Sequence, residues 1–299
     1  MKLSHLLGAM GLSISLLALG ACTTTRSDIS GTEKTTAQQL SIQHIRNATA
    51  KIDYAGKTFL IDPMLAPKDA YPGFEGTANS HLRNPLTDLP MPVAQILDGV
   101  DAVIVTHTHL DHWDGAAQER IPKNLPIFVQ NEADAGLIRG QGFSDVRIVG
   151  ERTRFDGVTL SKTGGQHGTD QMYAVPQLAS RLGEAMGVVL QADERKSIYI
   201  LGDTIWRPEV DQALQRYEPD ILIMNTGYAQ VTGFDGSIIM GKDDIVKAYR
   251  AVPRAKLIAV HMDAINHTVQ TRADLREFVQ HKGMQVRVLI PADGERMSF

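Results

Sequence analysis

The ten residues from Thr106 to Gly115, Thr-His-Thr-His-Leu-Asp-His-Trp-Asp-Gly, limit the fold of this chain more than any other stretch. They carry three imidazoles and two carboxylates, and they directly follow the run Asp-Ala-Val-Ile-Val. That run is typical of a buried strand, and ligand sites in open α/β sheets form at the carboxyl ends of strands. A polar surface loop is the alternative, but it would need neither a buried strand before it nor spaced partners later in the chain.

The spacing within this stretch suits two metal ions. His107 and His109 can turn to one side of a tight loop and share one cation, while Asp111 and His112 can diverge towards a second. Imidazole and carboxylate ligands together suit zinc, iron, manganese or nickel. Asp114 is better placed as the N-cap of a following helix than as a ligand.

Later positions offer partners for these ligands. His167 lies in the glycine-rich segment Gly-Gly-Gln-His-Gly after a predicted strand, where glycines let the backbone approach closely. Asp203 follows another predicted strand, and a carboxylate there is costly unless it is paired or metal-bound. His261 directly follows a third predicted strand and is the preferred ligand, with His267 as its rival.

Three further side chains are candidates for substrate contact or for support of the ligands. Asp62 is either a turn cap or the partner of a ligand imidazole, because metal-bound histidines usually donate their other N–H to a carboxylate or carbonyl. Tyr228 either donates its hydroxyl to a reacting oxygen or is a partly buried ring with a polar tip. His267 belongs to this group if it is not a ligand.

The pattern His-x-His-x-Asp-His-x-x-Gly, which starts at His107, resembles the signature of the metallo-β-lactamase-fold hydrolases. Gly-Asp-Thr at 202–204 and the isolated His261 after a strand are similar to that superfamily as well. Within it, the chain looks most like the ascorbate-6-phosphate-lactonase-like branch, through Asn-Ala-Thr at 47–49 and Leu-Ile-Asp-Pro at 60–63.

The resemblance implies two divalent metal ions, with zinc first and manganese or iron as alternatives. One ion would be held by His107, His109 and His167, and the other by Asp111, His112 and His261, with Asp203 shared. Two ions about 3.5–4 Å apart clamp the oxygens of a hydrolytic displacement and supply hydroxide from a bound water whose pKa falls towards about 7. Asp111 and Asp203 would be the catalytic carboxylates, and Asp111 would shuttle the proton.

A metal-dependent hydrolase of a small-molecule ester, lactone or phosphodiester is therefore the first hypothesis. The acidic Asp111 resembles lactonase, phosphodiesterase and glyoxalase-type branches more than antibiotic-hydrolysing ones, and a fold does not fix a substrate. The second hypothesis is an envelope lipoprotein that binds a metal or ligand with little turnover, although a complete ligand set favours catalysis. The formal net charge of -4 gives no basic footprint, so we expect no nucleic-acid partner.

Residues 1–21 predict a signal peptide, because an uncharged apolar run follows a basic residue and is short for a membrane span. The run ends Leu-Gly-Ala-Cys, which resembles the bacterial lipobox, so Cys22, the single cysteine, would carry lipid. Thr23 after it implies sorting to the outer membrane, facing the periplasm. Residues 22–39 are rich in Thr and Ser and predict a flexible tether.

Residues 40–299 predict one domain of the α/β (α+β) class. Hydrophobic residues make up 43% of the chain and charged residues 21%, which is ordinary for a globular protein. Four apolar strands end in polar residues, at His107, Asp203, Asn225 and His261. Strands and helices alternate in two halves, so the resemblance and the pattern together predict a four-layer αββα sandwich with the metals at one edge.

Two long stretches are expected to shape the pocket. Residues 64–92 carry five prolines without clear periodicity, which is typical of a functional or disordered loop, and we interpret them as a lid or pocket wall. His81 and Arg83 in this loop either meet an anionic substrate group or are solvated surface. Residues 169–183 are expected to be irregular and to drape over the site.

Overall fold

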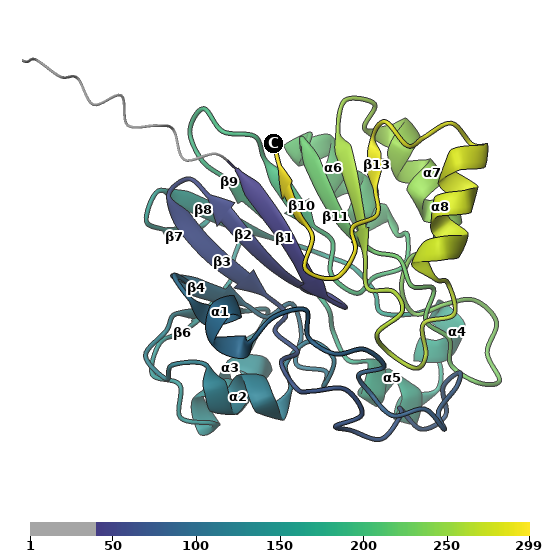
Figure 1. Cartoon of the computed structure of the whole chain (residues 1–299), viewed down its shortest axis with the longest axis horizontal. Helices are drawn as coiled ribbons and strands as arrows, with labels where there is room; N and C mark the ends of the chain where they lie inside the picture. The colour runs from purple at the N-terminus through teal and green to yellow at the C-terminus, as the bar shows by residue number, and fades with distance from the viewer. Residues whose placement is uncertain (1–39) are drawn as a thin grey trace, which may run out of the picture. The chain divides into compact units, whose positions relative to one another are not determined.

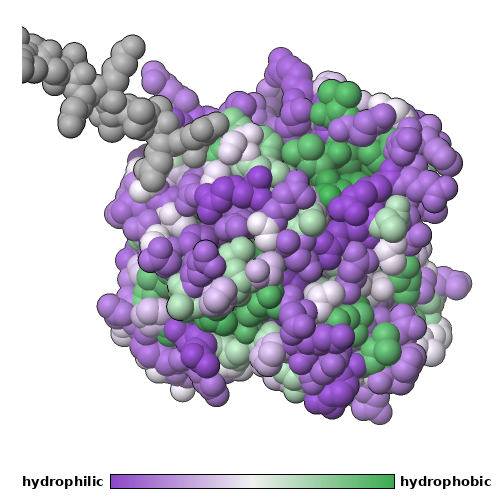
Figure 2. All heavy atoms as spheres, in the orientation of Figure 1, coloured by the Kyte–Doolittle hydropathy of each residue, from purple (hydrophilic) through white to green (hydrophobic). Residues whose placement is uncertain are grey.

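Residues 40–299 are described by the computed structural model, so the predicted signal peptide, Cys22 and the tether lie outside the described residues. Within the described part, no helix is long and apolar enough to cross a membrane. Figure 2 shows that one face of this part is mainly hydrophilic, with separate hydrophobic areas between the polar side chains. Most large apolar side chains are instead buried in the layers described below.

Two seven-stranded sheets form the centre of the described part (Figure 1). The first runs in the order β14 (Arg296–Ser298), β1 (Ser41–Arg46), β2 (Thr49–Tyr54), β3 (Lys57–Ile61), β4 (Ala102–Ile104), β5 (Ile127–Val129) and β6 (Val146–Ile148). The second runs in the order β13 (Val288–Leu289), β12 (Lys256–Val260), β11 (Ile221–Asn225), β10 (Ile198–Ile200), β9 (Gly187–Gln191), β8 (Val158–Thr163) and β7 (Thr153–Phe155). Both sheets are mixed, with parallel pairing from β3 to β6 and from β10 to β13.

Alternate side chains along a strand face different layers, because successive residues point to opposite faces of a sheet. In β11, Ile221 and Ile223 join a core made by both sheets, whereas Leu222 and Met224 join a core made with helices. This burial on both faces explains why the parallel strands read as continuous apolar runs in the sequence.

Helices cover the outer face of each sheet. The helices of the described part are α1 (Val93–Leu97), α2 (Gly115–Arg120), α3 (Glu132–Gly140), α4 (Asp170–Tyr173), α5 (Pro176–Leu182), α6 (Pro208–Tyr217), α7 (Lys242–Ala251) and α8 (Arg272–His281). Side chains of α1, α2 and α3 pack with the first sheet, and those of α6, α7 and α8 pack with the second (Figure 1). The predicted four-layer αββα sandwich is confirmed.

The prediction of an irregular segment at residues 169–183 was wrong, because α4 and α5 occupy most of it. The Thr169 side chain accepts a hydrogen bond from the backbone N–H of Met172 and caps α4, and Pro176 begins α5. Both helices are short, so packing of Met172 and Leu182 in a small apolar core contributes more to their stability than helix propensity does.

The loop at residues 64–92 ends where α1 begins, and several hydrogen bonds fasten it to the rest of the domain. The buried Arg46 guanidinium donates hydrogen bonds to the carbonyl oxygens of Met64, Ala66 and Thr87, at 3.0, 2.9 and 2.8 Å. Asn266 forms another attachment, described below, and the backbone N–H of Leu86 donates to the Ala264 carbonyl oxygen at 2.7 Å. His81 and Arg83 are exposed, and the Arg83 guanidinium donates to carbonyl oxygens of its own loop, as expected for solvated surface.

Candidate metal centre

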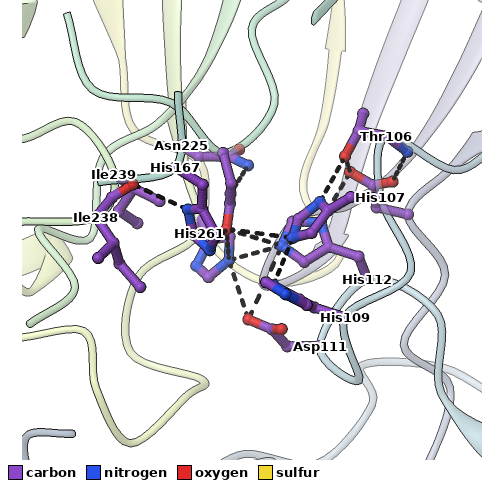
Figure 3. Close-up of polar contacts among 12 residues, drawn as sticks. Thr106, His107, His109, Asp111, His112, His167, Asn225, Ile238, Ile239 and His261 are labelled. Atoms are coloured by element: carbon purple, nitrogen blue, oxygen red, sulfur yellow. Dashed lines mark hydrogen bonds and ion pairs between the residues drawn. The ribbon is translucent and has the colours of Figure 1, made fainter. Parts of the chain in front are cut away.

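Five buried polar residues lie at the carboxyl ends of parallel strands. They are Asp62 after β3, His107 after β4, Asp203 after β10, Asn225 at the end of β11, and His261 after β12. His167 joins them from the segment after β8. Strand pairing aligns these residues within each sheet, and the packing of the two sheets brings the two sets together (Figure 3).

The backbone adopts unusual conformations at these strand ends. Asp62 and His261 have left-handed φ values of 43° and 62°, which for residues other than glycine cost about 1–3 kcal/mol and concentrate at functional sites. Gly202 has a φ of 67°, and a Cβ there would collide with the carbonyl oxygen of Met186. Glycine at 202 is thus required to turn the chain so that Asp203 enters the cluster.

The predicted ligands form two neighbouring groups. The first group is His107, His109 and His167, and the second is Asp111, His112, Asp203 and His261. In each group, one ligand atom per residue lies within 4.8 Å of those of the others, which is the spacing that one ion requires. The structure thus brings all seven predicted ligands together, in the partition that the resemblance implied.

Asp203 lies between the two groups. Its Oδ2 atom is 3.2 Å from Nε2 of His112 and 3.7 Å from Nε2 of His261, both in the second group. The same oxygen is 3.9 Å from Nε2 of His107 and 3.7 Å from Nε2 of His167, both in the first. The carboxylate is fixed from behind, because Asn225 Nδ2 donates to Oδ1 at 2.6 Å. This is the position from which one carboxylate can serve both ions.

Hydrogen bonds on the outer side of the imidazoles determine which nitrogen faces the cluster. The Nδ1 atom of His112 lies 2.9 Å from Asp62 Oδ2, and Nδ1 of His167 lies 2.9 Å from the Ile238 carbonyl oxygen. Each of these oxygens can only accept, so the ring proton is on Nδ1 and the Nε2 lone pair points inward (Figure 3).

The same argument applies to His107 and His109. The Thr106 hydroxyl donates to Asp62 Oδ2 at 2.8 Å, so it accepts from Nδ1 of His107 at 3.2 Å. Nε2 of His109 donates to the Arg181 carbonyl oxygen at 2.8 Å. The remaining nitrogens, His107 Nε2 and His109 Nδ1, then direct two lone pairs at each other across 2.9 Å. Such a contact is repulsive unless a cation lies between the two nitrogens.

The protonation states of the cluster residues also indicate a site for a cation. Burial lowers the pKa of His167 to about 4 and, with the charges of His112 and His109, lowers that of His107 well below the ordinary 6.5. Burial opposes ionisation of Asp203, but His112 and His261 outweigh it and hold the pKa of Asp203 well below 3.8. Two neutral imidazoles therefore surround an ionised carboxylate.

His112 differs from His107 and His167, because its pKa is raised. Burial opposes its charge, but Asp203, Asp62 and Asp111 outweigh burial and raise the pKa of His112 well above 6.5. The site thus attracts positive charge strongly enough to hold a second proton on this buried ring, at the Nε2 atom that would otherwise offer its lone pair to a cation. A divalent cation would supply that charge to all the inward lone pairs together, so the donor set fits metal ions.

A cavity of about 580 Å³ opens over one side of the cluster. His109, Asp111 and His167 reach its floor, and most other lining side chains are apolar. The apolar walls come from Phe74 in the 64–92 loop, from α5, and from the segment at 231–238. The prediction that the 64–92 loop forms a pocket wall is therefore confirmed for its part at Phe74–Thr77.

The structure separates the remaining candidates. Asp62 supports His112 and is not a ligand. Asp114 caps α2 through its Oδ1 atom, as predicted. His267 lines the cavity but belongs to neither metal group. Tyr228 does not line this cavity; it is 36% exposed and lines a groove beside α7 and α8, so the structure does not place its hydroxyl near the reacting atoms.

Several supporting residues escaped the sequence analysis. Asn47 donates from Nδ2 to the Asp111 carbonyl oxygen at 2.9 Å, while its own carbonyl oxygen accepts from the backbone N–H of His261 at 2.9 Å. It thus joins the ligand loop to the last ligand strand. Thr106 and Asn225 were visible next to strand ends, which was the one available signal for their roles.

Comparison with known proteins agrees with this geometry. The profile described as the beta-lactamase superfamily domain matches residues 57–262. The UPF0173 protein YddR of Bacillus subtilis is 44% identical over 87% of this chain and 100% of its own length. A possible metal-dependent hydrolase from Veillonella parvula is 53% identical, with a TM-score of 0.87 over 87% of this chain and 100% of that chain.

A third relative is the isothiocyanate hydrolase from Delia radicum gut bacteria. It is 51% identical, with a TM-score of 0.84 over 87% of this chain and 99% of that chain. The fold, the ligand geometry and these relatives define a metal-dependent hydrolase of the metallo-β-lactamase fold. Within that class, the chain belongs to the UPF0173 family.

Proposed function

We propose that this hydrolase acts on small, uncharged, largely apolar electrophiles, with isothiocyanates as the first class to test. The observation that carries the proposal is the cavity, whose walls are mainly apolar and whose floor holds His109, Asp111 and His167. An isothiocyanate presents one electrophilic carbon at the end of an apolar group, which suits such a cavity. The name of the relative from Delia radicum gut bacteria adds support from an independent direction.

Carboxylic esters and lactones are the second candidate class, in keeping with the resemblance to the lactonase-like branch. They too offer a neutral, electrophilic carbon. A phosphodiester suits the cavity less well because its charge needs cations. Among the described side chains that line the cavity, Arg181 is the one that is always cationic; it is exposed, and the acidic Glu75 also lines the cavity.

The cluster residues have separable roles in this proposal. His107, His109 and His167 would hold one ion, and Asp111, His112 and His261 the other, with Asp203 between them. Zinc is the first choice and manganese or iron the alternatives; such a pair would supply an activated water at neutral pH and would polarise the electrophile. Asp111 is the one cluster carboxylate on the cavity floor, where it can accept a proton from the attacking water.

The charge state of Asp111 and the shape of the cavity both affect this chemistry. Burial opposes ionisation of Asp111, but His112 and His261 outweigh burial and hold its pKa well below 3.8, so the side chain is ionised. The apolar cavity wall restricts bulk water around the reacting carbon, and electrostatic interactions are stronger where water is excluded.

The test combines elemental analysis of the purified full-length protein with a hydrolysis panel. The panel contains benzyl isothiocyanate, a p-nitrophenyl ester, a γ-lactone and bis(p-nitrophenyl) phosphate. We expect two metal ions per chain and the fastest turnover with the isothiocyanate. Faster turnover of the lactone or ester would favour the second class, and turnover of the phosphodiester alone would contradict the proposal.

His109→Ala tests the assigned centre. Because His109 provides one of three ligands to the first ion, we expect loss of bound metal and a fall in activity of at least about 100-fold. His81→Ala, which removes an exposed histidine, is the matched control and should keep both. Full activity in His109→Ala would show that the catalytic centre lies elsewhere.

Lipid attachment at Cys22 and an outer-membrane location facing the periplasm are proposals from the sequence alone. They rest on the apolar segment that ends in Leu-Gly-Ala-Cys. Metabolic labelling with a radioactive fatty acid tests them: label on the protein is expected, and its absence from a membrane-retained protein would contradict lipid anchoring.

A further inference from the structure

His267 is the buried imidazole that neither metal group uses. Its side chain lines the cavity, and the residue is 4% exposed. Its Nδ1 atom is enclosed without a hydrogen-bond partner, and within residues 40–299 no side chain or backbone group bonds to its Nε2 atom either. A buried polar ring without partners is destabilising, so its presence on a cavity wall calls for a ligand-related explanation.

The surroundings of His267 hold the ring in place. Its backbone carbonyl oxygen accepts from the N–H of Gln230 at 3.0 Å. The ring of Phe74 lies 5.1 Å away, centroid to centroid, at an interplanar angle of 50°. The neighbouring Asn266 donates to Thr77 Oγ1 at 3.0 Å and to the Ala78 carbonyl oxygen at 2.7 Å. A fixed ring with free nitrogens is suited to orienting a bound molecule.

His267 is neutral at physiological pH, because burial lowers its pKa to about 4. A neutral imidazole has one donor and one acceptor nitrogen. No acceptor faces Nδ1, so a proton there would be a buried, unpaired donor. The tautomer with the proton on Nε2 avoids this cost and leaves one N–H group available to a molecule in the cavity.

We propose that the Nε2–H group of His267 donates a hydrogen bond to the substrate heteroatom next to the reacting carbon, while Phe74 packs against the apolar part. This inference rests on the proposed function, since it requires a neutral substrate with such a heteroatom. His267 and Phe74 then determine which end of the substrate faces the cluster and which faces the apolar wall.

The chemistry of water addition gives this hydrogen bond a reason. When water adds to an isothiocyanate, a C–O bond forms, the C=N π bond breaks, and its electron pair passes to the N–C–S unit. The proton that leaves the water returns to the nitrogen, which gives a thiocarbamic acid with all atoms accounted for. His267 is not consumed; its N–H stabilises the charge that develops on the heteroatoms, as donors of an oxyanion hole do.

Three variants separate this role from a structural one. His267→Phe keeps a flat ring but loses the donor, His267→Gln keeps a donor, and His81→Phe is the exposed control. We expect metal content to remain unchanged in all three. We expect kcat for the isothiocyanate to fall about 100-fold in His267→Phe, to fall less in His267→Gln, and to change little in the control. Wild-type kcat in His267→Phe, or loss of metal from it, would overturn the proposal.

Binding of O-ethyl N-benzylthiocarbamate, a stable molecule with an N–C–S unit and an apolar ring, provides a readout without turnover. His267→Phe should weaken its binding about tenfold relative to His267→Gln, which corresponds to one hydrogen bond. If the wild type hydrolyses nothing in the panel but this difference is found, the proposed function fails and only the hydrogen bond from His267 to a bound molecule stands. If binding is equal in both variants, the role of His267 fails even where hydrolysis is observed.

The ring tautomer can be measured directly. A ¹⁵N–¹H correlation spectrum of the metal-loaded protein should show the His267 proton on Nε2. A proton on Nδ1 would contradict the donor assignment, whatever the activity of the variants.

Discussion

Asp62 affects two parts of the ligand loop at once. Its carboxylate accepts from the backbone N–H of Thr106 at 2.7 Å, from the Thr106 hydroxyl at 2.8 Å, and from His112 Nδ1 at 2.9 Å. Through the Thr106 hydroxyl it also determines the tautomer of His107. One residue after β3 therefore orients one ligand in each metal group.

Replacing Asp62 with Asn should weaken metal binding without removing a ligand. The amide has one acceptor oxygen in place of two, so either His112 or Thr106 loses its partner. We expect metal affinity to fall about 10–100-fold, the usual effect of losing a partner of a ligand histidine. Competition with a chromophoric chelator measures the affinity, and Asp193→Asn, at an exposed turn, is the control. Unchanged affinity in Asp62→Asn would contradict this role.

The candidate ligands that the structure brings together could be named from the sequence, because they follow recognisable apolar strands and because their spacing resembles a known signature. Their supporting contacts could be predicted only in part. His167 and His109 donate to the backbone carbonyl oxygens of Ile238 and Arg181, and every residue has such an oxygen. No residue type marks an acceptor of this kind, so only the folded structure reveals which nitrogens face the centre of the cluster.

Among the helices and strands, too, those with a local signal could be predicted from the sequence, and those that depend on distant contacts could not. β10, β11 and β12 were predicted because burial on both faces produces continuous apolar runs. α5 was missed although Pro176 begins it, since a seven-residue helix depends on packing more than on its own sequence. β14 was missed because its partner β1 lies at the other end of the domain's sequence, and nothing local in Arg296–Ser298 indicates that pairing.

Asn266 is the residue that joins two cavity elements. Its side chain accepts from the backbone N–H of Phe74 at 3.0 Å and from Asn84 Nδ2 at 2.8 Å, and it donates to Thr77 and Ala78. Its backbone N–H donates to Asn84 Oδ1 at 2.8 Å. The loop wall and the segment that carries His261 are therefore held in fixed register.

Asn266→Ala should loosen the loop wall while leaving the metal ligands in place. The variant leaves several buried donors and acceptors without partners, at a cost of about 1–3 kcal/mol for each group that water cannot reach. We expect faster hydrogen exchange at the Tyr71 and Asn84 amides, with unchanged metal content. Asn124→Ala, at an exposed position, is the control. Native exchange rates at both amides would contradict this role of Asn266 and would mean that the other attachments, such as Arg46 and the Leu86–Ala264 backbone bond, hold the loop.

Across the whole molecule, the metal centre is formed by both sheets, and its stability is coupled to that of the fold. The first sheet supplies the ligand loop after β4, and the second supplies Asp203, His261 and the segment with His167. Metal that binds to the folded chain and not to the unfolded chain stabilises the contact between the sheets. Removing the metal leaves several buried imidazoles whose protonation then determines how stability depends on pH.

The metal-free protein should lose stability as the pH falls from about 6.5 towards 4. Burial is the main cause of the lowered pKa values of His44, His107, His167 and His267, with those of His167 and His267 at about 4. Unfolded histidines bind protons below about 6.5, so in this window the unfolded chain binds more protons and stability rises with pH. Each ring contributes up to about 1.4 kcal/mol per pH unit. The raised pKa of His112 acts above 6.5 and adds little slope here.

Urea midpoints of the protein, measured with chelator from pH 4.5 to 7.5, test this prediction. His267→Gln should reduce the slope of stability against pH by the contribution of one ring, and the exposed His281→Gln should not. A profile without slope would contradict the assignment.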